Sequence, residues 1–302
     1  MAPVLTYRGR FAPTPSGPLH LGSLLTALAS WLQARSLQGR WLLRIDDLDR
    51  ERCIPGAADA ILRQLDAHGL HWDEVPRCQA QHLTEYVDAL RRLRATDRVY
   101  ACACTRAQLK VESLAGPDGP VYCGRCRDLG LPEAGHALRL RVSPEEIAFA
   151  DGWQGRQWRS LERDIGDFAI RRRDGAPAYQ LACAVDESAQ GITEVVRGTD
   201  LLGSTFMQLH LMDLLGLRRP QYRHLPVLTT ADGRKLSKQN HAAPIEAARA
   251  GANLRLCLGA LGQCPPPELD CASVAEILAW ATRNWTAARI PARSSIKVEQ
   301  IG

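Results

Sequence analysis

The sequence predicts an α/β protein with a doubly wound, Rossmann-type parallel sheet, one insertion and a short C-terminal helical appendix. Short apolar runs alternate with segments of helical periodicity through residue 100, which is the order expected of parallel strands joined by crossover helices. Between Tyr100 and Pro144 the chain becomes rich in Gly, Pro, Cys and Arg, which indicates an inserted segment. With 302 residues the chain can bury a full core.

The expected regions and elements follow the chain in order. The two halves of the Rossmann domain are expected at 1–99 and 163–242, and the insertion between them at 100–162. Residues 243–302 are expected to form a truncated helical region. Strands are expected at 4–11, 40–45, 192–200 and 222–228, and residues 163–185 are expected to form either strands or a strand–helix pair. Helices are expected from Leu21 onward and at 57–69, 81–94, 201–215, 245–261 and 274–286. Residues 293–302 are expected to be frayed.

The loop from Arg10 to Ser23 joins the first strand to the first helix. A strand that turns through a Pro/Gly loop into a helix leaves backbone N–H groups at the end of the sheet, which is a phosphate-binding arrangement. His20 and Ser23 lie three residues apart in the first helical turn, so both can point at one anion. Such loops are also common as plain connections, and this alternative stays open on the pattern alone.

A second loop, from Gly233 to Asn240, carries two lysines on either side of a serine. Each ammonium group of Lys235 and Lys238 can act as a movable point charge on a polyphosphate. An exposed basic turn is the alternative. Three acidic residues, Asp46, Asp47 and Asp49, follow the strand at 40–45, where ligands of open α/β sheets bind. We favour a binding role for them over helix capping and ion pairing with neighbouring arginines.

The insertion gathers four of the ten cysteines within twenty-five residues. Its own core is too small to hold it, and a metal would compensate. Cys102, Cys104, Tyr122 and Cys126 form a candidate four-ligand set for one structural zinc ion per chain. Cys123 stands in Cys-x-x-Cys spacing with Cys126 and is preferred over Tyr122 by spacing alone. Unbound thiols are the remaining alternative.

Composition restricts the class of protein. The sequence has no apolar run of about 18 residues and no charged-then-apolar leader, so we expect a soluble, cytoplasmic protein without membrane contact. The net charge of +5 supports RNA contact only weakly. All but four of the basic residues are arginines, which suits phosphate binding but would follow equally from a GC-rich genome.

The two loops together resemble the signature sequences of class I aminoacyl-tRNA synthetases, here His20-Leu21-Gly22-Ser23 and Lys235-Leu236-Ser237-Lys238-Gln239. The resemblance is to the glutamyl branch and covers about residues 7–245. Three features favour its short paralogues, which attach glutamate to the queuosine base of the tRNA(Asp) anticodon. The chain ends where an anticodon-binding domain would begin, the insertion has the Cys-x-Cys, Tyr, Cys pattern, and the lysine loop continues as Asn-His.

The resemblance implies tRNA-independent activation of L-glutamate by ATP, with magnesium, followed by transfer to queuosine in tRNA(Asp). It makes residues 243–302 a region that contacts a tRNA stem. It assigns ATP binding to His20, Gly22 and Lys238, and catalysis to His20, Ser23, Lys235 and Lys238. The implied glutamate pocket consists of Arg10, Phe11, Ala12, Pro13, Thr14, Asp46, Tyr179 and Arg197.

The chemistry of these residue types agrees with the implied pocket. Arg10 and Arg197 can each hold a carboxylate through two parallel N–H bonds, and Asp46 can accept a hydrogen bond from the amine. Two positions depart from the family pattern. Asp46 replaces the usual glutamate, and Cys183 stands where full-length enzymes have an asparagine that contacts the amino acid.

Two other functions are compatible with the sequence. A truncated synthetase that charges the 3′ end of tRNA(Glu) would use the same pocket. An inactive, zinc-stabilised RNA-binding paralogue would explain the departures at Asp46 and Cys183. We expect a monomer.

Overall fold

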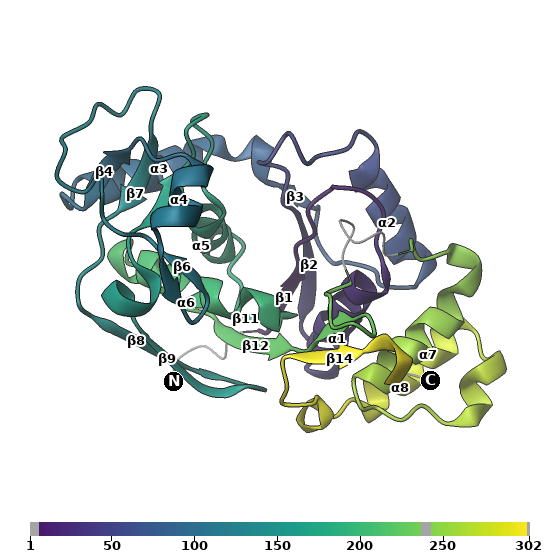
Figure 1. Ribbon diagram of the computed structural model, residues 1–302. Coiled ribbons are helices and arrows are strands. Elements are labelled where there is room, and N and C mark those ends of the chain that lie inside the picture. The colour runs from purple at the N-terminus through teal and green to yellow at the C-terminus, as the bar shows by residue number, and fades with distance from the viewer. Residues whose placement is uncertain (1–5, 237–242, 301–302) are drawn as a thin grey trace, which may run out of the picture.

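A computed structural model describes residues 6–236 and 243–300 and has a Rossmann-type parallel sheet at its centre (Figure 1). Lys238 and the rest of residues 237–242 lie outside the described residues. A hydrogen bond of 2.9 Å from the N–H of Thr193 to the carbonyl of Arg8 brings the two halves of the sheet together. The strands pair in parallel within two groups, β3 (Arg77–Cys78), β2 (Arg40–Ile45) and β1 (Arg8–Phe11) in one and β11 (Glu194–Gly198) and β12 (Gln221–Leu225) in the other, and the two groups meet where β1 contacts β11.

Helices cover both faces of this sheet because alternate residues of each strand point to opposite sides. On β2, Trp41, Leu43 and Ile45 pack in one apolar cluster and Leu42 in the other. The first cluster contains side chains of α1 (Leu21–Ser36), α2 (Ala57–Ala67), α7 (Ala250–Ala260) and α8 (Val274–Asn284). The second contains side chains of α3 (Leu83–Arg94), α5 (Tyr179–Ala189) and α6 (Leu202–Leu214).

Most of the insertion, up to residue 140, forms a lobe at one end of the molecule (Figure 1). Its antiparallel sheet has the order β10 (Phe168–Arg171), β7 (Ala137–Leu140) and β4 (Val99–Cys102), so β10 joins it from beyond residue 162. A short helix, α4 (Arg106–Glu112), begins at a capping box formed by Thr105 and Gln108, although the segment shows little helical periodicity. The other strands are β5 (Leu114–Gly116), β6 (Gly119–Val121), β8 (Glu146–Asp151) and β9 (Gly155–Ser160).

The β8–β9 hairpin extends the main sheet, because β8 pairs in parallel with β12 and in antiparallel with β9. The sheet is therefore parallel from β11 through β12 to β8, and the outermost strand β9 is antiparallel. Of the alternatives for 163–185, the strand–helix pair is confirmed, since β10 is followed by α5.

The prediction that residues 293–302 are frayed is wrong for the strand at 295–297, and residues 301 and 302 lie outside the described residues. β14 (Ser295–Lys297), drawn in yellow in Figure 1, pairs in parallel with β13 (Val227–Thr229). Its residue Ile296 is only 4% exposed. Burial of this side chain in the cluster around α1 holds β14 in place. The strand expected at 222–228 is also divided, because Pro226 separates β12 from β13.

Short single turns connect the larger elements. These are Gln79–Gln81, Leu161–Ile165, Thr199–Leu201, Ala247–Arg249, Pro267–Cys271, Ala287–Arg289 and Val298–Gln300. Within the described ranges, no helix has both the length and the apolar character that crossing a membrane requires.

Candidate active site

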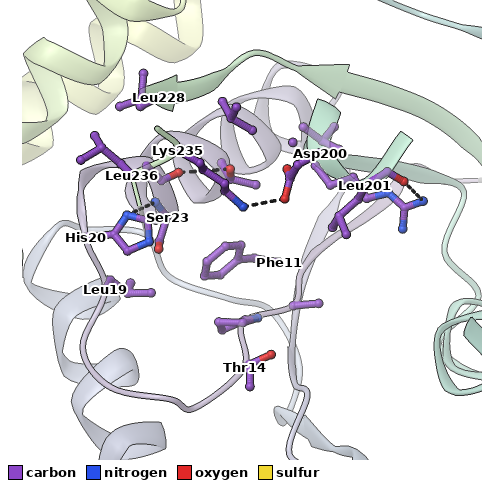
Figure 2. Close-up of a pocket in the computed structure, with 18 of the residues that line it drawn as sticks. Phe11, Thr14, Leu19, His20, Ser23, Asp200, Leu201, Leu228, Lys235 and Leu236 are labelled. Atoms are coloured by element: carbon purple, nitrogen blue, oxygen red, sulfur yellow. Dashed lines mark hydrogen bonds and ion pairs between the residues drawn. The ribbon is translucent and has the colours of Figure 1, made fainter. Parts of the chain in front are cut away.

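A cavity of about 780 Å³ opens beside the carboxyl ends of β1 and β11, where the two halves of the sheet meet (Figure 2). Ligands of open α/β sheets bind at this switch point. Most of the site residues predicted from the sequence line this cavity: Arg10, Phe11, Ala12, Pro13, Thr14, His20, Gly22, Ser23, Tyr179, Arg197 and Lys235. Asp46 is not among the described lining residues.

The start of α1 forms one wall of the cavity. His20 is the N-cap residue, and its Nδ1 accepts a hydrogen bond of 3.3 Å from the N–H of Ser23. Figure 2 shows the side chains of His20 and Ser23 next to each other, with Phe11 beside them. A Cβ on Gly22 would lie 3.1 Å from Cε1 of His20, so a larger residue there would crowd the imidazole. The N-terminus of a 16-residue helix thus faces the cavity, as an anion site requires.

The beginning of the lysine loop lies across the same cavity. Nζ of Lys235 is 2.5 Å from Oδ2 of Asp200, which follows β11 (Figure 2). A backbone bridge between Thr229 and Lys235 places the loop next to β13. The structure therefore brings His20 and Lys235 together from positions more than two hundred residues apart.

Arg197 is buried beneath the cavity, with only 3% of its surface exposed. Its Nε donates to Nε2 of His224 over 3.1 Å and its Nη1 to Oε1 of Gln208 over 2.9 Å. Nη2 donates to Oγ1 of Thr205 over 2.8 Å and to the carbonyl of Leu201 over 3.3 Å. Four of its five N–H groups are thus directed at protein acceptors, which corrects the expectation of two parallel bonds from Arg197 to a carboxylate.

Arg10 is also buried but keeps donors for a ligand. Its Nε lies 3.0 and 3.1 Å from the two carboxylate oxygens of Glu187, and its Nη1 donates to the carbonyl of Val196 over 3.1 Å. Among the residues described, no partner is recorded for Nη2. Arg10 can therefore hold a carboxylate from the cavity side while Glu187 fixes its other edge.

Asp46 forms an ion pair with a neighbouring arginine, which was the less favoured alternative for this residue. Its Oδ1 accepts a hydrogen bond of 2.7 Å from Nε of Arg44, and burial raises the pKa of the carboxyl group. Nη2 of the same arginine lies 3.5 Å from Sγ of Cys183, and its Nη1 lies 3.2 Å from Glu187. The two departures from the family pattern are therefore joined by a single buried arginine.

The charged network behind the cavity was not predicted from the sequence. Glu187 is buried between Arg10 and Arg44, and although burial opposes its ionisation, these two cations lower its pKa. Asp186 accepts hydrogen bonds from Arg77, Gln79 and Tyr86. An arginine inside the apolar strand at 40–45 and two acids inside the apolar run of α5 were the available signals.

Three thiols and a phenol meet in the insertion. The Sγ atoms of Cys104 and Cys126 lie 3.5 Å apart, and Oη of Tyr122 lies 3.5 Å from Sγ of Cys102 and 3.6 Å from Sγ of Cys104. The three sulfur atoms lie within 4.8 Å of one another. Cys123, the alternative by spacing, is exposed. This donor set fits a zinc ion, and the geometry favours Tyr122 over Cys123 as the fourth group.

The environment of Cys102 favours its thiolate, whereas burial raises the pKa of the neighbouring Cys104 thiol to about 11. Burial disfavours the charged form of Cys102, but hydrogen bonds from Tyr122 and Arg139 outweigh it and lower the pKa of the thiol to about 7. The guanidinium of Arg139 lies 3.2 Å from Sγ of Cys102 and stacks over the ring of Tyr122. A thiolate is the form that binds metal.

Residues 6–258 match the family model of tRNA synthetases class I (E and Q), catalytic domain. The chain belongs to this family. Curated relatives of this class I synthetase include the glutamyl-Q tRNA(Asp) synthetase of Ectopseudomonas mendocina, which is 49% identical with 98% of each chain covered. The enzyme of the same name from Methylococcus capsulatus is 50% identical, with 98% of this chain and 97% of the relative covered. The one from Chromobacterium violaceum is 51% identical, with 95% of this chain and 96% of the relative covered.

Solved structures of related synthetases share the fold of this class I synthetase. The crystal structure of glutamate-tRNA synthetase from Elizabethkingia anophelis covers 98% of this chain and 69% of its own, with 23% identity and a TM-score of 0.80. A glutamate tRNA ligase from Elizabethkingia meningosepticum in complex with its amino acid gives 23% identity, coverage of 98% and 68%, and a TM-score of 0.77. The predicted Rossmann-type fold of the glutamyl branch is thereby confirmed.

Proposed function

We propose that this class I synthetase activates L-glutamate with ATP, without tRNA, and transfers the glutamyl group to queuosine in the anticodon of tRNA(Asp). The observation that carries the proposal is the identity of about half of all residues to enzymes of that name over nearly the full length of both chains. The cavity between β1 and β11, which is lined by His20 and Gly22 of the first signature and by Lys235 and Leu236 of the second, supports it independently.

The activation step joins the α-carboxylate of glutamate to the α-phosphorus of ATP. A carboxylate oxygen forms the new P–O bond, the bond to the β-phosphate bridging oxygen breaks, and pyrophosphate leaves with its electron pair. Negative charge grows on the phosphates, so we assign its stabilisation to His20, Lys235 and the N-terminus of α1. Gly22 lets ATP approach and Ser23 donates to a phosphate, and Lys238 and a bound magnesium ion would add positive charge. No protein nucleophile takes part.

The amino acid is held on the opposite side of the cavity. We assign one carboxylate of glutamate to Arg10 through Nη1 and Nη2, and the other to Arg197 through its remaining N–H group and its charge. Tyr179, which is 40% exposed at the start of α5, donates from its hydroxyl group, and residues 11–14 form the wall. The amine requires an acceptor, and Asp46 would supply it through a water molecule, since its side chain is bound to Arg44.

Glutamine would be discriminated against because an amide leaves an arginine poorly paired. We further assign one structural zinc ion per chain to Cys102, Cys104, Tyr122 and Cys126. With four protein ligands the ion has no open position, so it would hold the insertion together without contacting substrate.

A truncated synthetase that charges the 3′ end of tRNA(Glu) is the second candidate, because it would use the same cavity. Periodate destroys the terminal ribose that such charging needs. Periodate also cleaves the diol of queuosine, so this diol is protected, or queuosine is introduced after the treatment. The proposed function predicts that such tRNA(Asp), with its 3′ end oxidised, still accepts labelled glutamate. Loss of acceptance under these conditions, with acceptance by intact tRNA(Glu), would establish terminal charging in its place.

A further inference from the structure

A buried chain of three side chains leads from the β8–β9 hairpin to the cavity. Oδ2 of Asp151 lies 2.6 Å from Nδ1 of His224, and Nε2 of His224 accepts the hydrogen bond of 3.1 Å from Nε of Arg197. The side chains of Asp151 and His224 are 0% exposed. His224 and Arg197 are register partners on neighbouring strands β12 and β11, so the backbone fixes their separation.

The donors and acceptors of this chain allow only one form of the imidazole. An ionised Asp151 accepts but does not donate, so Nδ1 of His224 carries the proton. Nε2 is then a lone-pair acceptor, as the N–H of Arg197 requires. The opposite tautomer would set two N–H groups against each other, and a protonated ring would set two cations against each other. Besides Asp151 and Arg197, the groups recorded in contact with the ring are Thr205 of α6, Tyr222 of β12 and Phe149 of β8.

We propose that Asp151 and His224 are positioning residues that hold Arg197 towards the bound amino acid by keeping the imidazole in its Nδ1–H tautomer. This rests on the role proposed above for Arg197 as a glutamate ligand. Of these three residues only Arg197 is among the described residues that line the cavity, so Asp151 and His224 act through Arg197. A flexible arginine would lose this orientation, and its carboxylate contact would weaken.

A single amide substitution tests the tautomer because the backbone fixes how the new amide lies. Oδ1 of Asp151 accepts N–H bonds from Trp153, Gln154 and His224 at 2.9, 2.9 and 3.1 Å. In Asp151→Asn these donors require the amide oxygen at that position, so the NH₂ group must face Nδ1. His224 would then have to protonate Nε2, directly against Arg197.

The experiment compares wild type with Asp151→Asn in two measurements. Imidazole ¹⁵N NMR, with His224 assigned by its absence in His224→Gln, is expected to show Nδ1–H in wild type and Nε2–H in the variant. Glutamate-dependent ATP–pyrophosphate exchange is expected to show a KM for glutamate about tenfold higher or more, with the KM for ATP unchanged. A changed tautomer with an unchanged KM for glutamate would overturn the proposal, as would Nε2–H in wild type.

Two further variants separate positioning from a general loss of structure. Glu194→Gln alters another buried acid, which lies on the same strand as Arg197 and binds Tyr7 and Arg223, and its KM for glutamate should equal that of wild type. The side chain in His224→Gln has no tautomers. In this background Asp151→Asn should therefore raise the KM for glutamate by less than twofold. An equal cost in both backgrounds would overturn the proposal. If wild type lacks exchange, the proposed function fails while NMR still decides the tautomer.

Discussion

Nζ of Lys235 lies 2.5 Å from Oδ2 of Asp200, so the lysine loop and the end of β11 are joined across the mouth of the cavity. Both side chains are partly exposed, 48% for the lysine and 31% for the aspartate. Exposed pairs of this kind contribute only about 0–1 kcal/mol to stability. Loss of this ion pair should therefore cost little stability.

The substitution Lys235→Ala should reduce glutamate-dependent exchange about 10-fold to 100-fold, because it removes a cation from the phosphate side of the cavity. The free energy of unfolding should change by less than about 1 kcal/mol, measured by urea denaturation. Lys110→Ala, at an exposed lysine on α4, is the control and should retain full exchange. Equal exchange in both variants would remove Lys235 from the mechanism.

The substitution Glu187→Gln should lower the free energy of unfolding by about 3 kcal/mol. It removes the carboxylate between Arg10 and Arg44, at 3.0 and 3.2 Å, and leaves two buried cations without this partner. Glu85→Gln is the control, because Glu85 also forms an ion pair with an arginine, Arg77, but its side chain is 38% exposed. This substitution should lower the free energy of unfolding by less than about 1 kcal/mol. Similar urea midpoints for both variants would contradict the importance of the buried network.

Metal analysis of purified protein should find one zinc ion per chain, and Cys102→Ser should lose it because a buried ligand is removed. Cys123→Ser should retain the ion, since Cys123 is exposed, whereas Tyr122→Phe should bind it more weakly. Retention in Tyr122→Phe together with loss in Cys123→Ser would show that the cysteine spacing, and not the phenol geometry, identifies the fourth ligand.

Acid should destabilise wild type through His224. Burial lowers the pKa of its imidazole to about 4 from 6.5, although the hydrogen bond to Asp151 acts in the opposite direction. Between these values the unfolded chain binds a proton that the folded protein does not, so stability falls as pH drops from 6.5 towards 4. The loss from this residue between pH 7 and pH 5 is about 2 kcal/mol. In His224→Gln, urea denaturation should show a loss smaller by about that amount. Equal losses would contradict a neutral His224.

The elements that carry the signature loops could be predicted from the sequence because their signals are local. The strand at 40–45 has its predicted bounds, since one apolar run is bounded by Gly39 and by acids. The helix from Leu21 follows from its leucine spacing. The short strand β14 around Ile296 could not be predicted in this way. A three-residue strand is stabilised by its pairing with β13 and by the apolar cluster beneath it, and neither leaves a local signal in the sequence.

The cavity lining was largely predicted, whereas the partners of its arginines were not. Arg10 and Glu187 are 177 residues apart in sequence, and no local pattern indicates that they pair. For the same reason the sequence suggested two fully available arginines, while Arg197 is held by His224, Gln208 and Thr205. A residue type and its place at a strand end predict that it reaches a site, but the donors that remain for a ligand depend on tertiary contacts.

The most direct test of the account is ATP–pyrophosphate exchange by the purified protein with L-glutamate, in the presence and absence of tRNA. We predict exchange that requires glutamate, is not supported by glutamine and proceeds equally well without tRNA. An absence of exchange under both conditions would contradict the assignment of the cavity between β1 and β11 as a glutamate-activating site, and exchange only with tRNA would contradict tRNA-independent activation.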